Sequence, residues 1–130
     1  MSQPFPDETG AQQFLGYQIV IDPVRVSLKI EDQHRNRYGA LHGGLISTLL
    51  DTVCGMTCAM AAAEDPTDPT RFATVSLTVN FMASANEGEV VAEAEITGGG
   101  KKIKFVDAVL RGEDGTKLAT AQAVMRQLSI

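Results

Sequence analysis

One long stretch with a single formally charged side chain is the feature of this sequence that most limits its fold. Between Tyr38 and Ala63 only Asp51 carries a charge. The segment from about 40 to 62 has few β-branched residues and ends in consecutive alanines, which favours a helix over a strand. Apolar residues surround this helix on nearly all sides, and such a helix is buried in a core rather than lying on a surface. The rest of the chain is therefore expected to wrap around it.

Alternating apolar and polar residues predict strands on both sides of this helix. Residues 24–30 alternate strictly before it. Four strand patterns follow it, at residues 74–81, 89–97, 102–111 and 117–126. The first of these places on one face Val75, Leu77, Val79 and Phe81. Short glycine-containing turns imply antiparallel pairing, so the sequence predicts an α+β fold in which an antiparallel sheet wraps around one long central helix.

Length and composition favour one ordinary globular domain. The 130 residues are 44% hydrophobic and fit a single domain, 1–130, with a variable N-terminal segment over 1–16. Within this segment, residues 7–16 are expected to form a short helix with Phe14 and Leu15 as its apolar contacts. The net charge of -5 argues against a nucleic-acid partner.

The location of the protein is also suggested by its sequence. The N-terminus lacks the basic start and apolar region of a signal peptide. Gly, Ser, Thr and the central Asp51 dilute the long apolar run, which argues against a membrane span. We therefore expect a cytoplasmic protein that contacts no membrane.

The two cysteines are expected to be buried and reduced. Cys54 and Cys58 lie four residues apart and share a helix face, but their geometry is poor for a disulfide. A zinc site would need more ligands than these thiols and the two histidines, His34 and His42. No metal site is therefore expected.

The glycine pair Gly43–Gly44 stands where the long helix is expected to begin. Free N–H groups and the helix dipole suit the binding of a carbonyl oxygen that becomes an oxyanion. Alternatively, the two glycines simply make a tight turn into the helix. A lone carboxylate in an uncharged helix is costly to bury, and catalysis is the leading explanation for Asp51. The alternative is a buried acid that is satisfied by hydroxyls such as Ser47 or Thr48.

The spacing of these groups limits how they act together. Asp51 follows Gly43 by eight residues, which is about 12 Å along a helix axis at a rise of 1.5 Å per residue. A carbonyl held at the Gly43 N–H is then out of reach of Asp51 on the same helix. If both groups act on one carbon, they come from two helices, which predicts a site shared between subunits of a symmetric dimer.

The run from Asn36 to Gly44, followed by Asp51, resembles the hot-dog-fold acyl-CoA thioesterases. It is most similar to the phenylacetate-degradation (PaaI) and thioesterase superfamily member 2 type. Residues 74–82 also resemble that family's strand after the helix, and the resemblance spans roughly residues 30–128. It implies a hydrolase that cleaves acyl-CoA to a free acid and coenzyme A, with coenzyme A as part of the substrate and no separate cofactor. It also implies either a homodimer or a homotetramer built as a dimer of dimers.

The same resemblance implies a role for each residue of the site. Asp51 would activate water as a general base or attack the thioester directly, and the Gly43 N–H would polarise the thioester carbonyl. Asn36 would lie near that carbonyl or the attacking water, and Thr74 would orient the water. His42 would organise the loop and the start of the helix, with direct proton transfer as the alternative.

Coenzyme A is expected to contact Gly44, Lys101 and Lys102. The turn at Gly98–Gly100 lacks the spacing of a phosphate-binding loop, so its default interpretation is a hairpin turn with solvated lysines. The resemblance adds a role for these two lysines in holding the coenzyme A phosphates. The acyl chain would lie beside the helix, where four apolar residues either line the pocket or belong to the core: Met56, Met60, Phe81 and Met82.

Two other functions remain open. A hot-dog hydratase or dehydratase would use a catalytic histidine and an acid in motifs that this sequence lacks. A non-catalytic acyl-CoA binder has the same fold, although the joint presence of Asp51, Asn36 and Thr74 argues against it. No Gly-x-Ser-x-Gly sequence is present, which argues against a serine-hydrolase triad.

Overall fold

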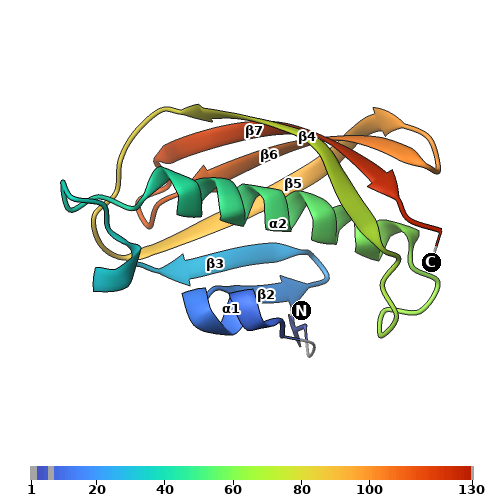
Figure 1. Ribbon diagram of the computed structural model, residues 1–130, viewed down its shortest axis with the longest axis horizontal. Helices are drawn as coiled ribbons and strands as arrows, with labels where there is room; N and C mark the ends of the chain where they lie inside the picture. The colour runs from blue at the N-terminus through green and yellow to red at the C-terminus, as the bar shows by residue number, and fades with distance from the viewer. Residues whose placement is uncertain (1–2, 6–7, 130) are drawn as a thin grey trace.

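A curved antiparallel sheet encloses one long helix in the computed structural model, which describes residues 3–5 and 8–129 (Figure 1). The strands have the order β1-β2-β3-β5-β6-β7-β4. The helices are α1 (Gly10–Leu15), η1 (Asp32–His34, a 3-10 turn) and α2 (Gly43–Ala62). The strands are β1 (Gln3–Pro4), β2 (Gln18–Ile21), β3 (Arg25–Lys29), β4 (Phe72–Phe81), β5 (Glu89–Gly99), β6 (Ile103–Arg111) and β7 (Lys117–Gln127). This confirms the predicted α+β arrangement and the five predicted strands.

The central helix α2 is the core of the structure. It contacts β3, β4, β5, β6 and β7. Its buried side chains are Ile46, Leu49, Leu50, Val53, Cys54, Cys58 and Ala59. By length and mean hydropathy of 1.5 this helix would also suit a membrane span, but here its apolar side chains pack into the concave side of the sheet.

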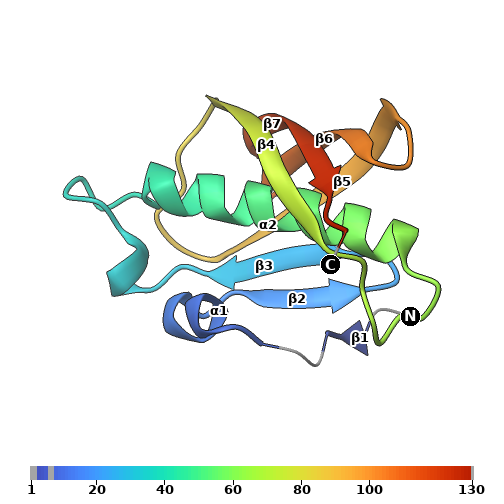
Figure 2. The ribbon, with the colours of Figure 1, turned by 45° about the vertical axis from the view of Figure 1, so that its right-hand side comes forward.

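The N-terminal segment adds an edge to the sheet that the sequence patterns did not predict. β2 pairs with β3, and β1 pairs with β2, so this segment lies along one side of α2 (Figure 2). The predicted short helix is present as α1, but Phe14 is 85% exposed, so its prediction as an apolar contact was wrong. Leu15 does pack against the core. The helix is short and ends at Gly16, and Tyr17 just beyond it is buried instead.

A β-bulge in β4 changes which residues face the helix. Thr74 pairs with Met125 and Ser76 pairs with Val124 of β7, so Val75 is an extra residue without a partner in the register. Strict alternation would place Thr74 on the outer face with Ser76. The bulge instead turns Thr74 to the same side as Leu77, toward α2, and leaves Val75 57% exposed. The predicted apolar face of this strand was therefore wrong at Val75.

Candidate active site

Asp51 and Thr74 meet beside the central helix. The Thr74 hydroxyl donates a hydrogen bond to Asp51 Oδ1 at 2.6 Å. Asp51 lies in the middle of α2, and Thr74 reaches it because of the bulge in β4. Ser47 and Thr48, the alternative partners proposed for Asp51, do not bind it. The Thr48 hydroxyl donates to the Gly44 carbonyl oxygen, and the Ser47 hydroxyl forms no hydrogen bond with any described residue.

Both side chains line a cleft of about 480 Å³. The cleft lies where the two edges of the curved sheet approach each other over α2, between the N-terminal segment and β4. Its walls are largely apolar and include Phe5, Ile19, Met56, Ala59, Phe72 and Met125. Of the four apolar residues predicted to line an acyl pocket, only Met56 does so; Met60 packs against the core, and Phe81 and Met82 are each 58% exposed.

A second group of predicted residues lies at the start of α2. His42 is the N-cap, and its Nδ1 accepts a hydrogen bond from the Gly44 N–H at 2.9 Å. The neutral imidazole therefore carries its proton on Nε2. The N–H groups of Leu45 and Ile46 bond to the His42 carbonyl oxygen. Among the described residues, the Gly43 N–H has no hydrogen-bond partner, so this donor remains free at the positive end of the helix dipole.

Both glycines of this turn are closely surrounded. A Cβ at Gly44 would lie 3.0 Å from His42 Nδ1, so a side chain there would push the imidazole away from its cap position. A Cβ at Gly43 would lie 3.4 Å from Cε1 of the Phe81 ring. The glycine pair therefore has a structural role in the start of the helix, and at Gly43 it also leaves a free donor.

Asn36 is held in the loop that leads to this helix. Its Oδ1 accepts hydrogen bonds from the N–H groups of Tyr38 at 2.9 Å and Ala40 at 3.2 Å. Both bonds use the oxygen, so the amide nitrogen is left as a donor without a partner among the described residues.

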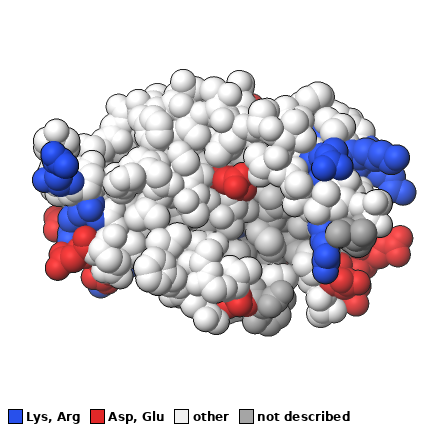
Figure 3. All heavy atoms as spheres, in the orientation of Figure 1, with Lys and Arg blue, Asp and Glu red and all other residues white. Residues whose placement is uncertain are grey.

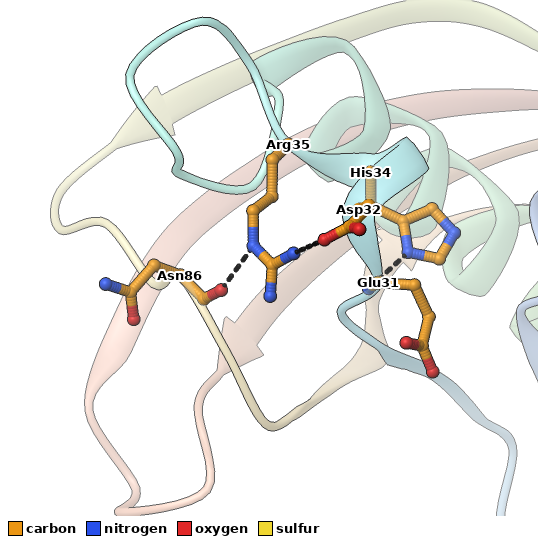
Figure 4. Close-up of polar contacts among 5 residues, drawn as sticks. All are labelled: Glu31, Asp32, His34, Arg35 and Asn86. Carbon is orange, nitrogen blue, oxygen red and sulfur yellow. Dashed lines mark hydrogen bonds and ion pairs between the residues drawn. The ribbon is translucent and has the colours of Figure 1, made fainter.

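The base of the same loop is fixed by the contacts shown in Figure 4. The Arg35 side chain donates one hydrogen bond to Asp32 Oδ1 at 2.6 Å and another to the Asn86 carbonyl oxygen at 2.8 Å. Buried His34 accepts the Glu31 N–H at Nδ1. Its Nε2 donates to the Leu15 carbonyl oxygen, outside the figure, at 2.6 Å. The His42 N–H then bonds to the carbonyl oxygen of His34. The loop and the start of α2 therefore form one braced unit.

The predicted site residues thus fall into two separate groups within one chain. Asp51 and Thr74 line the cleft, whereas Asn36, His42 and Gly43 do not. This separation agrees with the helix-rise estimate.

The two predicted lysines lie apart from both groups. Lys101 and Lys102 are exposed in the hairpin between β5 and β6, at an end of the molecule where Lys and Arg gather (Figures 1 and 3). Gly99 has φ +96°, and a Cβ there would overlap the Ile103 carbonyl oxygen, so the hairpin itself requires this glycine. Within the described chain, no three His, Cys, Asp or Glu side chains gather as a metal site would require.

The cysteines beneath the site are buried and free, as predicted. Burial, together with the nearby charges of Cys58 and Asp51, raises the pKa of the Cys54 thiol to about 12. Burial also raises the pKa of Cys58. Both residues are therefore neutral apolar packing groups near neutral pH.

One cleft residue was missed by the sequence patterns. Gln12 of α1 is only 2% exposed and lines the cleft together with Asp51. Nothing in the sequence distinguishes it from its neighbour Gln13, which is exposed. Its burial depends on how α1 docks against the sheet.

The family of the protein follows from comparison with known sequences. Residues 38–119 match the thioesterase superfamily, so the chain belongs to that family. The mouse protein acyl-coenzyme A thioesterase 13 is 33% identical over 92 residues, which cover 70% of this chain. The matched region spans 62% of the mouse protein, which is less than two thirds of its length.

Solved structures confirm the hot-dog fold. Thioesterase HI1161 from Haemophilus influenzae superimposes with a TM-score of 0.83 at 17% identity, covering 93% of this chain and 84% of that one. Protein BH2602 from Bacillus halodurans, whose crystal structure includes CoA, has a TM-score of 0.82 at 21% identity, covering 94% of this chain and 78% of that one.

Proposed function

We propose that this protein is an acyl-CoA thioesterase that hydrolyses a thioester to a free acid and coenzyme A. The observation that carries the proposal is the Asp51 carboxylate, hydrogen-bonded to Thr74 in a cleft with largely apolar walls. Membership of the thioesterase superfamily, the name of the mouse relative and the CoA found in BH2602 support the same substrate class.

In the proposed mechanism Asp51 acts as a general base. It removes a proton from a water molecule as the water oxygen attacks the thioester carbonyl carbon. The C–S bond then breaks, and the sulfur of coenzyme A leaves and takes up a proton. Thr74 orients the Asp51 carboxylate through its hydroxyl, and its oxygen can accept a hydrogen bond from the same water. Direct attack by Asp51 on the carbonyl carbon is the alternative role of this carboxylate.

The carbonyl oxygen needs a donor where negative charge develops, and the free Gly43 N–H is suited to this task. The Asn36 amide nitrogen is a second donor from the same braced loop. Because Gly43 and Asp51 of one chain lie far apart on α2, the proposed site combines Asp51 and Thr74 of one subunit with Asn36 and Gly43 of another. The assembly would be a homodimer or a dimer of dimers.

The unpaired edge of the sheet supports such an assembly. In the strand order of the described residues, β4 is an outer strand whose only neighbour is β7. Exposed Val75, Phe81 and Met82 lie in this strand or directly after it. A long apolar edge strand favours pairing with another chain, and the Phe81 ring already lies beside Gly43.

For the coenzyme A part of the substrate we propose the hairpin between β5 and β6. Lys101 and Lys102 project from the hairpin between β5 and β6 and could bind its phosphates. Gly44 would serve this part of the substrate only by giving it room, because its N–H is already bonded to His42.

Release of free thiol from a panel of aromatic, short-chain and long-chain acyl-CoAs tests this proposal directly. We expect thiol release from at least one of these classes. Tight binding of acyl-CoA without thiol release would instead identify a binder. Hydration of an enoyl-CoA with the thioester left intact would identify a hydratase.

A further inference from the structure

The buried side chain of Gln12 has no hydrogen-bond partner among residues 3–5 and 8–129. Among the described residues, the buried side chains with an amide, imidazole or charged group are Gln12 and His34, and the other buried side chains with polar atoms are Tyr17 and the two cysteines. His34 uses both ring nitrogens in hydrogen bonds. The backbone of Gln12 is also satisfied, by the Thr9 hydroxyl and by the Gly16 N–H. Its carboxamide, in contrast, forms no hydrogen bond with any described residue.

Gln12 belongs to the wall of the cleft as well as to the buried part of the structure. In the described part of the chain, the side-chain atoms that are fully buried without a partner are Thr57 Oγ1 and Gln127 Oε1, and no Gln12 atom is among them. Gln12 lines the cleft that also contains Asp51 and Thr74. Gln12 is therefore part of the wall around the space that a substrate would fill.

An unpaired amide in such a place affects which ligands fit. A hydrocarbon chain that covers it would exclude water and return no hydrogen bond, which is unfavourable for such a group. A hydroxyl or carbonyl group on the ligand would replace that water, because a carboxamide both donates and accepts hydrogen bonds. Sites built to bond a polar group discriminate strongly against the analogue that lacks it.

We propose that Gln12 is a specificity-determining residue that hydrogen-bonds a polar substituent on the acyl group. This inference rests on the proposed thioesterase function and on Asp51 and Thr74 as its reactive end. The enzyme then favours acyl chains that carry a hydroxyl or keto group over plain chains of the same length. The position of the favoured substituent reports how far Gln12 lies from the scissile bond.

The test compares pairs of straight-chain acyl-CoAs of equal length, with and without one hydroxyl group, placed at successive positions along the chain. The full-length wild type is compared with Gln12→Met, which keeps the length of the side chain but removes the amide. Gln13→Met is the matched control, because Gln13 is the exposed neighbour on the same helix and does not line the cleft. The readout is the ratio of kcat/KM values within each pair, which a general loss of stability would not change.

We expect the wild type to favour the hydroxylated substrate at one or more positions by at least about tenfold, equal to about 1.4 kcal/mol. Gln12→Met should lose this preference and keep or gain activity on the plain chain, and Gln13→Met should behave as the wild type. A wild type without preference at any position, or a preference that survives in Gln12→Met, would overturn the role of Gln12 while leaving the thioesterase function intact. Failure to release thiol from any acyl-CoA would overturn both proposals.

Discussion

At the scale of single residues, Asp51 is the group on which the proposed chemistry depends. Asp51→Asn removes the base but keeps an oxygen that can accept the Thr74 hydrogen bond. We therefore expect the variant to fold normally and to lose activity by about 10²-fold or more. Turnover of acyl-CoA, circular dichroism and thermal melting measure these two outcomes. Wild-type turnover in a folded Asp51→Asn protein would show that another group is the base.

Thr74 tests whether the hydroxyl itself matters. Thr74→Val keeps the β-branched shape that suits a strand but removes the bond to Asp51. Thr74→Ser keeps the hydroxyl. Loss of one hydrogen bond to a charged group costs about 1.5 kcal/mol, so kcat should fall about tenfold in Thr74→Val. Thr74→Ser should stay close to the wild type, and equal loss in both variants would point to packing rather than to the hydroxyl.

The buried Cys54 thiol should make the protein less stable toward unfolding at alkaline pH. Its folded pKa of about 12 lies above the ordinary pKa of 9.0 for a thiol in an unfolded chain. The unfolded chain therefore loses its proton first, and the stabilisation present below pH 9 is lost as the pH rises toward 12. The slope approaches about 1.4 kcal/mol per pH unit. Urea unfolding at pH values from roughly one unit below to about one and a half units above the unfolded thiol's pKa of 9.0 should show a steeper decline for the wild type than for Cys54→Ala. Parallel curves would contradict this assignment.

At the scale of elements, the start of α2 depends on the fit between Gly44 and His42. Gly44→Ala places a Cβ 3.0 Å from Nδ1, which should displace the imidazole from the N-cap and cost about 1 kcal/mol. Gly55→Ala is the matched control in the same helix, because a Cβ there meets nothing within 4 Å. It should stabilise the helix by about 0.5–1 kcal/mol. Denaturant midpoints of the two variants should shift in opposite directions, and a shift in the same direction would argue against the cap.

The elements also show what the sequence could predict. Composition was sufficient for α2, and apolar–polar patterning was sufficient for five strands, since even β3, with five residues, alternates strictly. It missed β2, whose four residues are too few to show a period. It would also have placed Thr74 on the wrong face, because a bulge depends on pairing with β7 and not on the sequence of β4 alone. Thr74 entered the predicted site only through the resemblance to a family.

At the scale of the whole molecule, the two groups of site residues lie apart within one chain, and we propose that they are complementary halves of a shared site. Asp51 and Thr74 would supply the base, away from the free N–H of Gly43 in the same chain. Asn36 and Gly43 provide donors without an acid beside them. The helix-rise estimate from sequence already separated these groups, because rise per residue is nearly constant. The side chains of the cleft, such as Gln12, could not be predicted, because they depend on how the N-terminal segment docks.

A shared site can be tested with dimers made of two different variants. Asn36→Asp keeps the oxygen that holds the loop but removes the donor amide. The Asp51→Asn and Asn36→Asp subunits are co-expressed with different tags, and dimers that carry both tags are purified. If the site is shared, one of the two sites in each such dimer is complete. We expect about half of the wild-type activity from these mixed dimers, although each variant alone is inactive.

The matched control places both substitutions in one subunit and pairs it with a wild-type subunit. If each site takes Asp51 from one chain and Asn36 from the other, every site in this dimer carries one substitution, and activity should be lost. If each site lies within one chain, the wild-type subunit keeps its activity and the first mixed dimer has none. The two arrangements therefore give opposite results with the same set of side chains. The outcome decides whether the lone charge of α2 serves its own chain or the facing one.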